Sequence, residues 1–89
     1  MTEIPDIETV ETEDEYIHVR FRDPDRFDDI RTPDWAKNPA ESVSEGSEVR
    51  TGRVKGSDDW GVASVLIEKH VGEETAREQA REIVKKIES

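Results

Sequence analysis

The most apolar run of the chain, and the one that decides how it folds, is Trp60-Gly61-Val62-Ala63-Ser64-Val65-Leu66-Ile67. Its apolar residues do not alternate with polar ones, which is typical of a strand covered on both faces. The segment 48–54 before it is rich in β-forming residues, and the intervening cluster Lys55-Gly56-Ser57-Asp58-Asp59 is typical of a turn. Two such runs around a glycine-containing turn predict a β-hairpin whose second strand is the central one.

A helix is predicted directly after this hairpin, at the C-terminal end of the sequence. Its apolar residues recur every three or four positions and form one helical face: Ala76, Ala80, Ile83, Val84 and Ile87. Acidic residues begin the segment and lysines end it, which matches the charge preference of the two helix ends. We therefore expect one amphipathic helix that packs its apolar face on the hairpin.

An earlier strand is predicted at 16–22, because Ile17, Val19 and Phe21 alternate with polar residues. Residues 31–46 contain two prolines, so we expect only short helical turns there. The predicted fold class is α+β: a three-stranded antiparallel sheet with a C-terminal helix on one face, in the order strand, irregular segment, strand, strand, helix. Residues 1–13 are interpreted as an acidic flexible leader, and residues 14–89 as a single domain.

The charge balance narrows the classes of function. The 89 residues carry a formal net charge of −10, and 40% of them are charged. Such a charge repels a phosphate backbone and destabilises the compact state at low ionic strength. Arginine outnumbers lysine, and this composition is typical of a halophile that keeps salt in its cytoplasm, haloarchaeal or viral. An ordinary acidic bacterial protein is the alternative.

Several chemistries have no support in the sequence. The absence of cysteine excludes disulfides and thiolate metal sites. Neither His18 nor His70 has the context of a catalytic triad, and no phosphate-binding loop is present. Asp58-Asp59 does not match a calcium loop. We expect no enzyme activity, cofactor, metal or small-molecule ligand, and an acidic N-terminus without an apolar run favours a cytoplasmic protein that contacts no membrane.

A local concentration of basic residues is the candidate interaction surface. Tyr16, His18, Arg20 and Arg22 share the outward face of the first strand, and Arg53 and Lys55 join them if the hairpin pairs alongside. Trp35 and Trp60 are further candidates, because tryptophan is enriched in binding hot spots. The alternatives are that the arginines only cover a sheet face and pair with carboxylates, and that both tryptophans are core or lid residues.

Short pieces of the sequence resemble a known group of domains. They are Phe21-Arg22-Asp23-Pro24-Asp25-Arg26-Phe27-Asp28, Ile30-Arg31-Thr32, Gly52-Arg53-Val54-Lys55-Gly56 and Ser64-Val65-Leu66-Ile67. They are similar to small uncharacterised accessory domains of haloarchaeal and tailed-virus genomes, some encoded near prohead proteases. The resemblance covers residues 16–84 and implies a viral or mobile-element accessory protein, with no protease residues to carry over.

These observations lead to one functional hypothesis and one alternative. The hypothesis is a non-enzymatic protein-interaction or structural accessory module that binds a protein partner or a second copy of itself. The homodimer is suggested by the unalternating strand, since one helix cannot cover both faces of the sheet and an exposed apolar patch needs a partner. The alternative is a nucleic-acid-associated accessory protein that uses the arginine-rich sheet face.

Overall fold

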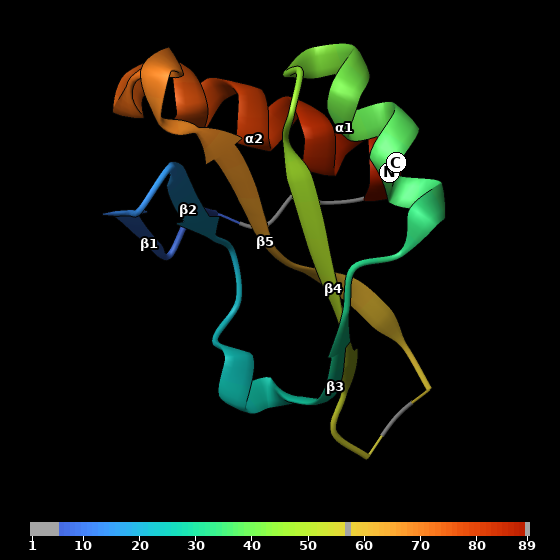
Figure 1. The fold of residues 1–89 in the computed structure, drawn as a ribbon. Coiled ribbons are helices and arrows are strands. Elements are labelled where there is room, and N and C mark those ends of the chain that lie inside the picture. The colour runs from blue at the N-terminus through green and yellow to red at the C-terminus, as the bar shows by residue number, and fades with distance from the viewer. Residues whose placement is uncertain (1–5, 57, 89) are drawn as a thin grey trace.

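A computed structural model describes residues 6–56 and 58–88 of the chain. It is an α+β fold in which a five-stranded antiparallel sheet carries two α-helices on one face (Figure 1). The strands are β1 (Thr9–Glu13), β2 (Tyr16–Arg20), β3 (Phe27–Arg31), β4 (Glu48–Val54) and β5 (Trp60–Glu68). The helices are α1 (Lys37–Val43) and α2 (Glu73–Glu88).

The strand order is β1-β2-β5-β4-β3, so β5 is central, and β1 and β3 are the two edges. The predicted hairpin is therefore present as β4 and β5, and the alternating segment forms β2. Short 3₁₀ turns join the other elements: η1 (Pro24–Arg26), η2 (Asp34–Ala36) and η3 (Lys69–Val71). The prediction of a three-stranded sheet with one helix is wrong, because β1, β3 and α1 were missed.

β1 lies inside the segment that we interpreted as a flexible leader. Residues 9–13 pair with β2 through a tight two-residue turn, in which Asp14 has a φ of 50°. Aspartate tolerates this left-handed conformation better than most residues, although the turn contains no glycine to signal it. The first residues of that leader, 1–5, lie outside the described part of the chain.

β3 and α1 were missed for different reasons. β3 has no alternating pattern, and its pairing with β4 shifts between Phe27 and Asp29, as in a β-bulge. α1 contains Pro39, which argued against a helix. That proline lies in the first turn of α1, where backbone N–H groups have no partner within the helix, so it removes no hydrogen bond.

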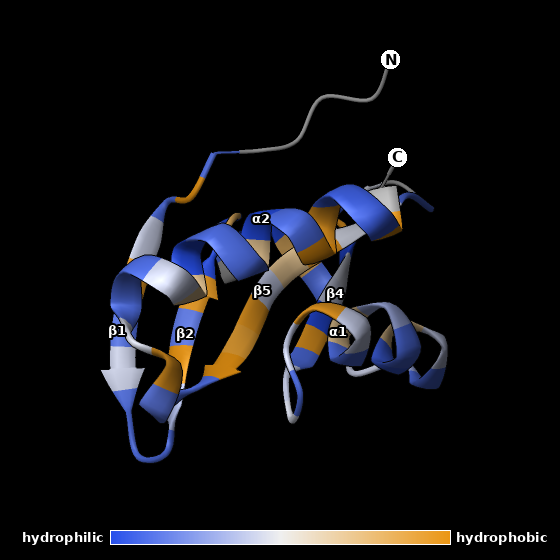
Figure 2. Cartoon of the chain, turned by 90° about the horizontal axis from the view of Figure 1, so that it is seen from above, coloured by the Kyte–Doolittle hydropathy of each residue, from blue (hydrophilic) through white to orange (hydrophobic). Residues whose placement is uncertain are grey.

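The core lies between the helices and one face of the sheet. Ala76, Ala80, Ile83 and Val84 of α2 are all fully buried there, as the helical periodicity predicted. They pack with alternate residues of the strands: Ile17, Val19, Val49, Val65 and Ile67. α1 adds Ala40, whose small side chain permits close packing with α2. Figure 2 shows the apolar (orange) segments of β5 and of α2, which lies across it.

The helices cover only part of the sheet. β3 and the turn end of the β4–β5 hairpin continue beyond them (Figure 1). The large exposed apolar side chains of the described residues belong to this uncovered end or to η2: Ile30, Trp35, Val54 and Trp60. A partner would therefore find apolar surface near β3, and not over the helices.

Candidate functional site

The sheet face opposite the helices, called here the open face, carries mainly polar side chains over β2 and the middle of β4, and apolar Phe27 and Ile30 lie at its β3 end. Leu66 of β5 points to this face, between His18 of β2 and Glu48 of β4 in the pairing register. It is nevertheless only 3% exposed. The exposed apolar patch on which we based the expected homodimer is therefore not found over the middle of β5.

Arginines meet on the open face where β2, β5 and β4 run side by side. Arg20 pairs with Ser64, and Ser64 pairs with Arg50 on its other side. Arg22 follows β2, and its Nη1 donates a 2.7 Å hydrogen bond to the carbonyl oxygen of Val62. Arg20, Arg22 and Arg50 line a pocket of about 100 Å³, together with Ile30, Ala63 and Ser64. We call this the arginine pocket.

Arg53 and Lys55 do not join this pocket. Val49 is in the core, so the alternation of β4 places Thr51 and Arg53 on the helix side of the sheet and Arg50 on the open face. Lys55 lies beyond the end of β4 and is exposed. The sequence contained the signal for Arg50, because identifying Val49 as a core residue is enough to assign the faces of this strand.

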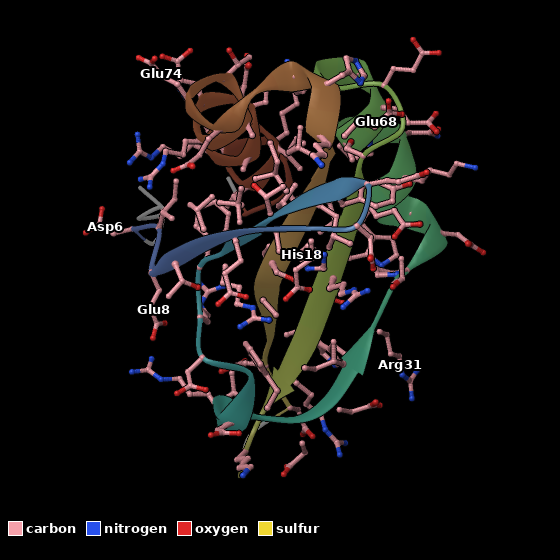
Figure 3. The ribbon with its side chains drawn as sticks, turned by 60° about the vertical axis from the view of Figure 1, so that its left-hand side comes forward. Asp6, Glu8, His18, Arg31, Glu68 and Glu74 are labelled. Carbon is pink, nitrogen blue, oxygen red and sulfur yellow. The ribbon has the colours of Figure 1, made fainter. Side chains whose placement is uncertain are left out.

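Tyr16 and His18 lie toward the other end of β2, away from the arginine pocket. Tyr16 pairs with Glu68 of β5, and His18 Nε2 is 3.8 Å from Glu13 Oε2 on β1. His70 Nδ1 lies 3.2 Å from Glu68 Oε2 near the same end. Figure 3 shows His18 over the sheet and Glu68 at its helix end. The predicted basic face is therefore divided into an arginine part and a part in which histidines lie beside carboxylates.

Both tryptophans are exposed and line one groove. Trp35 is 61% exposed and Trp60 is 45% exposed, so the alternative that they are core residues does not hold. They line the groove with Arg31, Pro33 and Thr51, and its volume is about 420 Å³. We call this the tryptophan groove. Its floor is the uncovered helix-side face of β3, β4 and β5, and η2 forms the wall.

Arg31 connects the groove to the β3 edge. Its Cζ atom lies 5.5 Å from the centre of the Trp60 ring, within the range of a cation–π contact. Its Nε donates a 2.9 Å hydrogen bond to Asp29 Oδ2, so its charge is already balanced. Figure 3 shows Arg31 projecting from the β3 edge, across the sheet from Asp6 and Glu8. Arg31 therefore demonstrates that the Trp60 ring accepts a guanidinium.

Several exposed acidic residues lie near the tryptophans of the groove. Asp34 precedes Trp35 in η2, Asp59 precedes Trp60, and both are exposed. Exposed Asp28 lies on the neighbouring β3. Arg53 pairs with Trp60 and lies on the same helix-side face, so charges of both signs lie near the groove in a chain whose net charge is −10. The groove thus combines aromatic faces with nearby anions, which suits a cationic ligand.

The described residues offer little that could form another kind of functional site. In residues 6–56 and 58–88, no group of three or more histidine, cysteine, aspartate and glutamate side chains is arranged to hold a metal. No helix among the described residues is long and apolar enough to cross a membrane. Comparison with protein-family models, curated proteins and solved structures finds no match for this chain. The functional argument therefore rests on the two sites alone.

Proposed function

We propose that this chain is a non-enzymatic interaction module that binds a basic segment of another protein in the tryptophan groove. The observation that carries the proposal is the exposure of both tryptophans in one groove. Tryptophan is the side chain most enriched in binding hot spots, because it buries a large apolar surface and loses little rotamer freedom. Two exposed rings in one groove provide a ready-made anchor site.

The basic character of the partner follows from charge. The chain carries a net charge of −10, and Asp34 directly precedes Trp35. A lysine or arginine side chain over the Trp35 ring gains a cation–π contact and the attraction of this negative charge. Arg31 over Trp60 is an example of the same interaction within the chain. An acidic or neutral segment gains neither.

Two other occupants fit the groove less well. A nucleic acid would bring phosphates toward a chain of net charge −10, even though the rings can stack on bases. A second copy of the chain also carries −10, and pairing of two β3 edges would bring together the aspartates at positions 28 and 29. The short, bulged and charged form of β3 is typical of an edge that resists such pairing.

The proposal is tested with a labelled heptapeptide that alternates arginine and glycine, measured by fluorescence anisotropy. Trp35→Ala and Trp60→Ala remove a ring without changing the net charge, so non-specific attraction to the acidic chain is retained. Each loss of a cation–π contact of about 0.5–2 kcal/mol should weaken binding by about 2- to 30-fold. Tyr16→Ala, at the far end of β2, is the matched aromatic control and should bind like the unmodified chain.

Three outcomes would overturn the proposal. One is equal affinity of the peptide for the unmodified chain and both tryptophan variants. Another is equal binding of a peptide in which glutamate replaces arginine. The third is a stable dimer in sedimentation experiments that both Trp35→Ala and Trp60→Ala dissociate, because the groove would then hold a second copy.

A further inference from the structure

We infer that the arginine pocket on the open face binds a single oxyanion, the phosphate or carboxylate group of a small ligand or side chain. This site is separate from the tryptophan groove, because Arg50 and Arg31 lie on opposite faces of the sheet in the β4 register. The inference does not depend on the proposed function. It rests on the arrangement of side chains around Ser64.

The size of the neighbouring residues creates the pocket. Arg20 and Arg50 flank Ser64 on the two adjacent strands, and Ala63 is next to it. Directly opposed residues have Cβ atoms about 4.5–5.5 Å apart, so the two arginine stems rise about 10 Å apart with small side chains between them. Long cationic side chains around a small centre leave a hollow that their guanidinium groups can line.

The charges of two of the pocket arginines, Arg20 and Arg50, are not fully balanced by carboxylates. Arg20 Nη2 approaches Glu11 Oε2 at 3.9 Å, in a partly exposed pair of the kind that contributes little. Arg50 is exposed and, within the described residues, its side chain has no hydrogen-bond or ion-pair partner. Placing like charges around one pocket costs free energy. An anion in the pocket removes that cost.

The volume of the pocket limits its ligand. About 100 Å³ corresponds to roughly three water molecules, each with about 30 Å³ of liquid volume. That space accepts one phosphate or carboxylate group and is too small to enclose a base or a sugar ring as well. Guanidinium groups bind both oxyanions through paired N–H···O hydrogen bonds. Ile30 on the rim offers an apolar contact to whatever group carries the anion.

The test uses inorganic phosphate and acetate as probes, titrated into isotope-labelled protein and followed by amide NMR at constant ionic strength with chloride. Saturable shifts centred on Ser64, Arg20 and Arg50 are expected. Arg50→Gln and Arg20→Gln should each weaken binding by about tenfold or more, because each removes hydrogen bonds from a charged donor. Arg77→Gln, which removes the same charge from the α2 ion pair with Glu73, is the control and should leave affinity unchanged.

The outcomes separate the sources of the anion. Binding of phosphate alone assigns the site to phosphoryl groups, and binding of both probes assigns it to oxyanions generally. Absence of saturable shifts at Ser64 would overturn the inference, as would equal weakening in Arg77→Gln. A single-stranded oligonucleotide that binds far more tightly than phosphate, with a steep salt dependence lost in Arg50→Gln, would replace it with a polyanion surface. Unchanged circular dichroism of each variant verifies that the fold is intact.

Discussion

Gly52→Ala should destabilise the domain because the added methyl group would collide with the Phe27 ring. Gly52 is buried in β4, and the Phe27 ring of β3 lies directly over it. An added Cβ would overlap Phe27 Cγ and lie 2.5 and 2.7 Å from the two Cδ atoms, whereas ordinary contact begins at 3.4 Å. The ring, which is 6% exposed, must therefore withdraw by about 1 Å from its packed position.

The expected cost is about 1–3 kcal/mol, typical of forcing extra carbon into a packed site. A domain of this class has about 5–15 kcal/mol of stability, so urea denaturation will detect the change as a lower midpoint. Phe27→Ala alone should cost about 3–5 kcal/mol. In that background Gly52→Ala should be neutral or slightly stabilising, because alanine loses less backbone entropy than glycine in a strand.

The double-mutant cycle therefore predicts a coupling of about 1–3 kcal/mol between Gly52 and Phe27. Gly56→Ala is the control: its φ is 75°, but no atom lies within 4 Å of the added Cβ. It should cost only the left-handed backbone penalty of about 1–2 kcal/mol and show no coupling to Phe27. Additive costs for Gly52→Ala and Phe27→Ala would refute the role of this contact in holding β3.

Further predictions concern the core and the charge. Ile83→Ala, at a fully buried position of α2, should cost about 2–4 kcal/mol in urea denaturation, and an unchanged midpoint would contradict the packing of this helix face. Ala40→Leu should cost about 1–3 kcal/mol, because Ala40 is fully buried between α1 and α2; a neutral result in the same assay would place α1 elsewhere. The melting temperature should rise from low to molar salt, because screening relieves the repulsion of a net charge of −10; calorimetry showing no rise would remove the argument for adaptation to salt.

The elements that the sequence predicted are those whose apolar residues follow a regular period. The alternation of β2 and the helical face of α2 each require burial on one side, so the pattern alone identifies them. β5 was predicted as the central strand from its continuous apolar run. These three elements supply most of the buried core.

The missed elements are stabilised by contacts that no local pattern reveals. β3 depends on the seating of Phe27 over Gly52, two residues far apart in the sequence. α1 depends on small buried alanines and on the position of Pro39 in its first turn. β1 depends on the conformation of Asp14. Each of these is a tertiary or turn-specific effect, which a count of apolar periods does not detect.

The candidate sites were predicted only in part, and the same kind of tertiary effect explains what was missed. Arg20 and Arg22 were identified from the alternation of β2, whereas Arg50 was passed over in favour of Arg53 and Lys55. Both tryptophans were considered for binding, but the sequence could not tell an exposed ring from a buried one. Their exposure follows from the way the sheet continues past the helices, which is a property of the whole fold.

The most direct test of the proposed function is the intrinsic fluorescence of the protein during titration with the arginine–glycine heptapeptide. The chain contains two tryptophans, and both line the groove, so their emission reports on this site. We predict a saturable change in emission whose midpoint equals the dissociation constant from anisotropy, and no change with the glutamate peptide. Peptide binding detected by anisotropy without any change in tryptophan emission would place the binding site elsewhere and contradict the account.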